Sequence, residues 1–253
     1  MSSPPLEPLY RFQPFCSHRQ IPWANGLGTS HEIIRILRDP SREQLSLPWV
    51  RRVALAPVVE PGPFSHYPGV DRQLVVVAGV GGMSLRFGDE SSSVSSSSSS
   101  SVASFGTVVS FSGDVPTSAS SVGTGVWDLG VMSFRGETGL DGTSTSTSCS
   151  SCCEMASPPR LVILPAGSSL PRGHGANVLV AIRSAEENNG GEHASGRSEH
   201  AVGALRIVDG EVVAVLEFSE LDAVIVGEDK AARGREPAIV IIRGTFACVY
   251  DLF

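Results

Sequence analysis

Arg52, Ala54 and Ala56 alternate with larger apolar residues along a short predicted strand. Because successive side chains of a strand point to opposite faces, the arginine and the two alanines share one face. Small neighbours leave room beside the guanidinium, which suits bidentate capture of a carboxylate if this face lines a cavity. The structural alternative is a buried arginine paired with Glu32 or Asp71. The pattern therefore predicts a fixed cation that meets an anionic ligand, an internal acid, or both.

His66 is a second candidate for chemistry, because an imidazole titrates near neutral pH and can hydrogen-bond a ligand or transfer a proton. The structural alternative is a strand-edge histidine satisfied by the backbone. A hydrolytic group with Ser65 and Asp71 is not expected, because sequence neighbours on a strand point to opposite faces. A metal is not expected either, since a site needs about three protein donors and the nearby Arg72 would repel a divalent ion.

The five cysteines do not predict a disulfide framework, because their number is odd and their spacing is uneven. They are Cys16, Cys149, Cys152, Cys153 and Cys248. Cys149 and Cys152 form a C-x-x-C pair in a Ser/Thr-rich stretch, but no second ligand pair accompanies them. We interpret them as exposed thiols of a loop rather than as a metal or redox cluster. No cofactor is predicted.

The charge balance argues against nucleic acid as a partner. The net charge is −7 and the sequence pI is about 5.4, whereas a duplex binder needs a basic face to neutralise phosphates. No apolar run reaches the ~18 residues that a membrane span needs. The first eight residues are polar and proline-rich, without the apolar core of a signal peptide. We therefore expect a cytoplasmic protein with no membrane partner.

Short strand patterns recur along the chain, and no window longer than about ten residues has helical periodicity. Glycine and proline are frequent, with 27 and 17 residues, as expected for many strands joined by turns. Strands are predicted at 53–59, 74–78, 83–87, 105–111, 161–164, 178–182, 205–208, 211–218, 222–226, 238–243 and 246–250. The pair Asp209-Gly210 predicts a type I′ hairpin turn. The predicted fold class is all-β, as a sandwich or barrel.

Low-complexity segments divide the chain. Residues 91–101 are serine apart from Val94, and they cannot bury enough apolar surface to offset their ordering entropy. Residues 136–159 and 186–200 are further polar stretches, which we interpret as loop insertions, with a phosphorylated or regulatory tract as the alternative. The expected organisation is a first lobe at 5–137 with an insertion at about 89–104, a linker at 138–159, and a second lobe at 160–253.

Four blocks in the first half resemble the HutD/Ves family. They are W-A-N-G-L-G-T-S-H-E from Trp23, R-V-A-L-A from Arg52, G-P-F-S-H-Y-P-G-V-D-R from Gly62, and F-S-G-D-V-P from Phe111 with residues 128–136 after it. The resemblance implies a double cupin, in which each lobe is an RmlC-like jelly roll, that is, a double-stranded β-helix barrel. Beyond Pro159 only the strand pattern supports the second lobe of this bicupin.

Cupins that bind a metal carry two histidines and a glutamate before a strand that ends in glycine. Counted from Gly79, the glutamate position falls on Arg72 and the second histidine position falls near Tyr67 or Pro68, so His66 alone remains. The position of the last histidine ligand is occupied by a proline. The resemblance therefore implies a pocket without a metal.

This sequence departs from the family pattern at three places. Leu27 replaces a glycine and is expected to adjust a turn. Ala54 replaces the usual serine and Gly130 stands where the family has asparagine. The last two changes remove polar groups that could touch a ligand.

We predict a small pocket in the N-terminal lobe that binds a small-molecule anion. The residues expected to line or support it are Trp23, Asn25, Thr29, Glu32, Arg52, His66 and Arg72. Trp23 could equally belong to the core, and Asn25 with Gly26 could serve only a turn.

The expected function is metal-independent binding of a small carboxylate or formyl compound. The resemblance links such a protein to the regulation of histidine utilisation. One alternative is a metal-independent, isomerase-like enzyme that uses His66 or Glu32 as acid and base. Another is an interaction scaffold that uses the serine-rich loops. A homodimer is one expectation for the assembly.

Overall fold

The computed structural model describes residues 10–37, 47–88, 99–135, 158–170, 176–182, 201–227 and 237–252. These residues form strands and turns, with one short 3-10 segment at Phe15–Ser17, so the all-β prediction is confirmed. Within these ranges no helix has the length and apolar character needed to cross a membrane. The expected linker at 138–159 lies outside the described residues except for its last two, and so does the polar stretch at 186–200.

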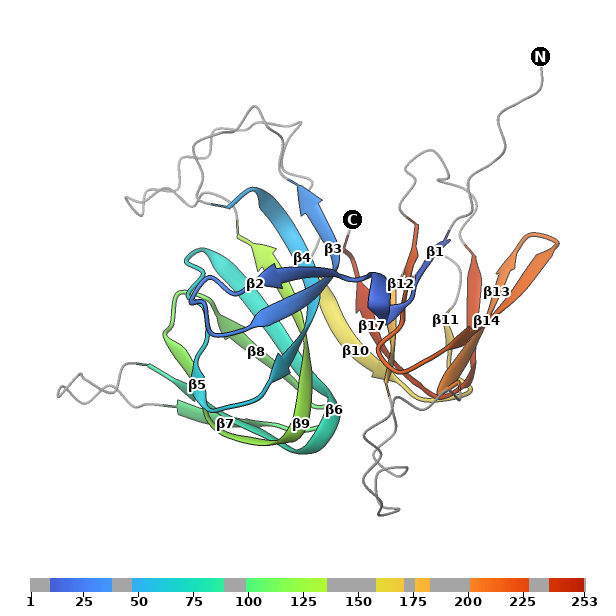
Figure 1. Cartoon of the computed structure of the whole chain (residues 1–253). Helices are drawn as coiled ribbons and strands as arrows, with labels where there is room; N and C mark the ends of the chain where they lie inside the picture. Colours follow the sequence, from blue (N-terminus) through green and yellow to red (C-terminus); the bar gives the residue numbers. More distant parts are fainter. Residues whose placement is uncertain are drawn as a thin grey trace, which may run out of the picture. The chain divides into compact units, whose positions relative to one another are not determined.

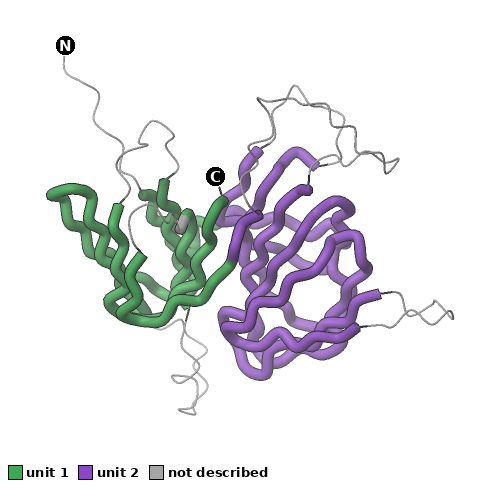
Figure 2. The backbone as a smooth tube through the Cα atoms, turned by 180° about the vertical axis from the view of Figure 1, so that it is seen from behind, with its two compact units in different colours: residues 1–18, 161–253 green, residues 19–160 purple. Residues whose placement is uncertain are grey.

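The chain forms two compact units, which Figure 2 colours separately. Unit 1 comprises Met1–His18 with Leu161–Phe253, and unit 2 comprises Arg19–Arg160. We expected the first lobe to begin at residue 5. The structure instead assigns the segment before Arg19 to unit 1, because β1 (Tyr10–Gln13) pairs in antiparallel register with β15 (Ala223–Val226). A pattern of local strands cannot reveal such a distant pairing.

Unit 2 contains one eight-stranded sheet with the order β2-β3-β4-β9-β6-β7, in which β5 also pairs with β9 and β8 with β6 (Figure 1). The bounds are β2 Arg19–Pro22, β3 Thr29–Leu37, β4 Trp49–Val58, β5 Gly62–Pro63, β6 Val70–Phe87, β7 Ser99–Ala103, β8 Val108–Ser112 and β9 Thr117–Phe134. The long strand β9 lies between β4 and β6. Side chains of these three strands that are in register therefore form adjacent rows on one face.

Strand β6 is continuous, whereas the sequence predicted separate strands at 74–78 and 83–87. Several register shifts with β9 mark bulges in its middle, and bulges bend a strand without ending it. The glycines there permit the bend. Gly79 has φ +98°, and a Cβ at this position would lie 2.6 Å from the carbonyl oxygen of Gly125.

The bend folds the β6–β9 pair over its own apolar side chains. Leu74 and Val126, on one side of the bend, share a core cluster with Met83 and Ala119, on the other side. The cluster also contains Val58, Val76, Leu85, Ala103 and Val109. Apolar residues of β6 that are far apart along the strand thus bury one another.

The serine-rich insertion is in part a strand. Residues 99–103, which we expected to belong to a loop insertion at 89–104, form β7 and pair with the end of β6. Its side chains are mostly exposed, and Ala103 alone is fully buried. Main-chain pairing to β6 needs no apolar side chains, which explains why composition predicted a loop. Residues 89–98 lie outside the described part of the chain.

Unit 1 contains a five-stranded sheet, β1-β15-β12-β17-β10, and a four-stranded sheet, β11-β16-β13-β14. The remaining bounds are β10 Arg160–Leu164, β11 Ser169–Leu170, β12 Ala176–Ile182, β13 Gly203–Asp209, β14 Val212–Phe218, β16 Ala238–Arg243 and β17 Thr245–Tyr250. One core cluster joins Leu179 and Phe246 of the first sheet to Leu205 and Ile239 of the second. The two sheets of unit 1 therefore pack against each other.

The predicted hairpin between β13 and β14 forms, but its turn differs from the expectation. Asp209 pairs with Val212, so the two loop residues are Gly210 and Glu211. Gly210 has φ +61°, whereas neither Asp209 nor Glu211 has a positive φ. A positive φ at the first loop position alone is the pattern of a type II′ turn rather than the predicted type I′ turn.

Candidate ligand-binding site

The register of β4, β9 and β6 places chemically distinct rows on one face of the unit 2 sheet. From β4 through β9 to β6, the rows are Arg52–Met132–Arg72, Ala54–Gly130–Leu74 and Ala56–Asp128–Val76. The shared face of Arg52, Ala54 and Ala56 that the alternation predicted is present. The small side chains of the two alanines and Gly130 leave space between charged groups.

A pocket lies over these rows. It is lined by Trp23, Ser30, Arg52, Ala54, Ala56, Val58, Phe64, Ser65, Tyr67, Arg72, Gln73, Leu74, Asp128, Gly130 and Met132. Three of the seven predicted site residues, Trp23, Arg52 and Arg72, are among them. All lining residues belong to unit 2, so the site is complete within that unit.

Arg52 is held at one side of the pocket by an acid. Its Nε lies 3.1 Å from Oε2 of Glu32, which is itself buried and lies 3.5 Å from Nε of Arg35. The Nη2 of Arg52 is buried and has no hydrogen-bond partner among the described residues. Both alternatives for Arg52 are therefore compatible with the geometry: one edge of the guanidinium meets Glu32, while the residue also lines the pocket.

Arg72 is surrounded by aromatic rings. Its guanidinium carbon lies 4.9 Å from the ring centroid of Phe111, 5.4 Å from that of Phe64 and 5.8 Å from that of Tyr67. Nη1 donates a hydrogen bond of 3.2 Å to the carbonyl oxygen of Ser65. Cation–π contacts of this kind fix the orientation of the guanidinium and stabilise its charge. The cation is thus preorganised at the pocket wall.

The two arginines influence each other. Burial lowers the pKa of Arg72, Asp128 and Tyr67 oppose this effect, and the positive charge of Arg52 adds to it. They stand in one row on either side of Met132, roughly 10 Å apart at the backbone from two strand spacings. An anion placed between their side chains would relieve this repulsion.

Asp128 is a site residue that the sequence analysis did not single out. It is buried in the pocket wall and makes no hydrogen bond or ion pair with any residue in the described part of the chain. Burial raises the pKa of its carboxyl from 3.8 to about 7, and Arg72 lowers it only in part. The signal that could have revealed it is its even spacing with Gly130 and Met132 along one strand.

The first sequence block contributes a wall to the pocket. Trp23 lines the pocket and donates a hydrogen bond of 3.0 Å from Nε1 to Oγ of Ser30. Gly28 lies against its ring, since a Cβ there would be 2.8 Å from Cε3 of the indole. Thr29 is not among the lining residues, and it precedes Ser30 on β3.

Asn25 acts in the turn rather than in the pocket. Its Nδ2 donates to the carbonyl oxygen of Pro63 at 2.7 Å, and its Oδ1 accepts from the backbone N–H of Leu27 at 3.1 Å. Gly26 has φ +72°, as the turn prediction for this pair required. The exposed Leu27 lies in this turn.

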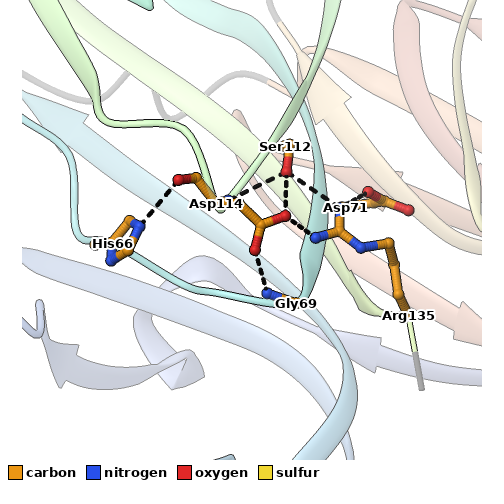
Figure 3. A network of polar contacts seen from close by, with 6 residues as sticks. All are labelled: His66, Gly69, Asp71, Ser112, Asp114 and Arg135. Atoms are coloured by element: carbon orange, nitrogen blue, oxygen red, sulfur yellow. Dashed lines mark hydrogen bonds and ion pairs between the residues drawn. The ribbon is translucent and has the colours of Figure 1, made fainter. Parts of the chain in front are cut away.

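His66 does not line the pocket, although the sequence analysis placed its imidazole there. Its side chain is exposed, and Nε2 lies 3.2 Å from the carbonyl oxygen of Asp114. The backbone contact matches the structural alternative given above, although His66 lies in the segment between β5 and β6 rather than at a strand edge. Figure 3 shows that His66 belongs to a network outside the pocket residues.

That network joins the third and fourth sequence blocks. Asp114 accepts a hydrogen bond of 2.7 Å from the backbone N–H of Gly69 and a second of 2.7 Å from the hydroxyl of Ser112 (Figure 3). Arg135 pairs with Asp71 at 2.6 Å and with Asp114. Asp71, given above as a possible partner of Arg52, therefore pairs with Arg135 instead. Alternation explains this, because Asp71 and Arg72 point to opposite faces of β6.

Metal donors do not gather in the described residues: no three His, Cys, Asp or Glu side chains are close enough to hold an ion. Cys16 is exposed and Cys248 is buried, and both are free thiols. Cys149, Cys152 and Cys153 lie outside the described residues. The metal-free pocket therefore stays a prediction.

The fold and the pocket define an all-β protein with arginines at its candidate site. The HutD family profile matches residues 16–167, more than half of the chain, and the chain belongs to the HutD family. No curated protein matches it.

Solved structures share this fold. PA5104 from Pseudomonas aeruginosa PAO1 has a TM-score of 0.59 and 17% identity, covering 95% of this chain and 97% of its own. HutD from Pseudomonas fluorescens SBW25 has a TM-score of 0.57 with the same identity and coverage. YlbA from E. coli has a TM-score of 0.51 at 10% identity, covering 95% of this chain and 90% of its own. At these identities the likeness shows the fold alone.

Proposed function

We propose that this chain is a metal-independent, two-lobed cupin (bicupin) that binds a small carboxylate or formyl compound in the unit 2 pocket. The observation that carries the proposal is the row Arg52–Met132–Arg72, in which two guanidiniums flank one space. Glu32 neutralises one of them, so the pair retains positive charge for an anion.

The rest of the pocket favours a small ligand with an apolar part. Ala54 on β4 and Leu74 on β6 present an apolar floor between the charged rows, and Ala56 and Val58 continue the apolar surface along β4. Trp23 adds a flat wall. Ligand pockets commonly combine such surfaces with a few fixed polar groups that set orientation.

The HutD family supports a role in a metabolic context, and we propose a cytoplasmic regulator linked to histidine utilisation. The solved structure of HutD from Pseudomonas fluorescens SBW25, a similar protein, is one of a formate condition. Formate is the simplest carboxylate. An enzyme with His66 or Glu32 as its acid–base group has less support. His66 lies outside the pocket lining, and Glu32 is engaged by Arg52 and Arg35.

The test is a thermal-shift and NMR titration with formate, acetate and N-formylglycine. We expect stabilisation of the wild type, because a ligand that binds only the folded state raises the free energy of unfolding. Arg72→Met keeps a long apolar side chain between the rings and is expected to weaken binding at least tenfold. Arg135→Met removes an arginine outside the pocket and is the matched control.

Equal binding by Arg72→Met and the wild type would refute the assignment of the pocket. Absence of binding by all three acids would refute the proposed ligand class. Elemental analysis of the purified protein tests the remaining part, because stoichiometric zinc, iron or manganese would contradict metal-independent binding.

A further inference from the structure

Asp128 is a buried acid that the proposed carboxylate site does not use. Its side chain lines the pocket without an internal hydrogen bond or ion pair in the described part of the chain. Gly130 precedes Met132 on the same face of β9, and a Cβ at Gly130 would lie 3.9 Å from Oδ1 of Asp128. Open space therefore adjoins one carboxyl oxygen. A buried polar group without a partner is costly, which favours a partner supplied by a ligand.

The surroundings of Asp128 determine its protonation state. The charged or titratable groups that line the pocket with it are Arg52 from β4, Tyr67 from the segment after β5, and Arg72 from β6. Trp23, which follows β2, and Ser30 of β3 add no ionisable group. Burial nevertheless raises the pKa of Asp128 to about 7, so the Arg72 charge offsets only part of the desolvation. A bound carboxylate adds a second negative charge and raises this pKa further.

A protonated carboxyl is a hydrogen-bond donor, whereas a carboxylate only accepts. The row of Asp128 and the row of the two arginines are four residues apart on β9, which is roughly 13 Å of strand. The side chain of Arg52 shortens this gap. It contacts Glu32, and the register partner of Glu32 is Ala54, which lies in the row between Arg52 and Asp128. A ligand of several bonds can therefore reach from the guanidiniums to Asp128.

We propose, on the basis of the proposed function, that the preferred ligand is a carboxylate with a carbonyl group several bonds away. Arg52 and Arg72 hold the carboxylate, and protonated Asp128 donates a hydrogen bond to the carbonyl. Recognition of this ligand is coupled to a proton on Asp128. An acid of the same length without the carbonyl leaves the Asp128 hydroxyl unpaired and binds more weakly.

The experiment compares 4-oxopentanoate with pentanoate, which have the same chain length and differ in the carbonyl group. Dissociation constants are measured by ligand-detected NMR at pH 6 and pH 8 for the wild type, Asp128→Asn and Asp128→Ala. We expect the wild type to prefer 4-oxopentanoate about tenfold at pH 6, as one additional hydrogen bond allows. The preference should be smaller at pH 8, because a larger fraction of Asp128 is then ionised, even with the bound carboxylate raising its pKa.

The two variants separate the donor from the charge. Asp128→Asn keeps an N–H donor at every pH, so the preference should persist and lose its pH dependence. Asp128→Ala should lose the preference at both pH values while pentanoate still binds. Equal affinity of the wild type for the two acids at pH 6 overturns the ligand class, although the carboxylate site would stand. Failure of both acids to bind the wild type overturns the proposed function and this inference with it.

Discussion

Replacement of Asp128 by asparagine is expected to stabilise unit 2, and to do so increasingly as the pH rises. The carboxyl is buried without a hydrogen bond or ion pair to the described residues. Its pKa rises from 3.8 to about 7, with burial as the main cause and Arg72 as the opposing one. An amide has nearly the same shape and carries no charge at any pH, so the variant removes this desolvation cost.

The sign follows from proton linkage. Between pH 4 and pH 7 the folded wild type holds a proton that the unfolded chain has released, so its stability falls as the pH rises through this window. Above the folded-state pKa the stability falls no further, because both the folded and the unfolded chain have released this proton. A carboxyl moved from 3.8 to about 7 corresponds to a cost of about 4 kcal/mol, of which about 2–3 kcal/mol develops between pH 5 and pH 8.

Urea unfolding followed by tryptophan fluorescence measures this effect, because Trp23, Trp49 and Trp127 are the three tryptophans of the chain and all lie in unit 2. The difference in unfolding free energy between Asp128→Asn and the wild type should grow by about 2–3 kcal/mol from pH 5 to pH 8. Asp71→Asn is the control. It breaks an exposed ion pair, and the cost should stay below about 1 kcal/mol. A pH-independent difference for Asp128→Asn would refute the reasoning.

Three further predictions concern packing and thiol access. Gly123→Ala should destabilise unit 2 in the same urea assay, because its Cβ would overlap the carbonyl of Val80. Gly62→Ala is the control and should be tolerated, since its Cβ would lie in open space. Phe246→Ala should cost about 3–5 kcal/mol by circular dichroism, because the ring is fully buried in unit 1. Cys248 should resist alkylation in the native protein, as peptide mapping would show, since burial raises the pKa of its thiol.

Local patterns predicted part of the pocket lining. Alternation alone placed Arg52, Ala54 and Ala56 on one face, and the structure puts them together in the lining. Arg72 was also found. Asp128 was missed, because its even spacing with Gly130 and Met132 shows which face it shares but not whether its carboxyl is buried or solvated. Its significance depends on the rows of β4 and β6 beside it.

Other placements depended on contacts that are distant in the sequence. His66 follows Ser65 in a block that suggested a pocket, yet it lies at the Asp114 backbone. Arg135, rather than Arg52, pairs with Asp71, since the register of β6 and β9 determines which charges meet.

The amino-acid sequence by itself determined the all-β class, the family resemblance and the strand face that carries Arg52, because turn residues and two-residue alternation are local properties. Tertiary structure alone decided that β1 joins unit 1, that β6 bends without ending, and that Asp128 is buried in the same pocket as two arginines. Strand register and desolvation arise only when distant segments pack together, so no local pattern could have specified them.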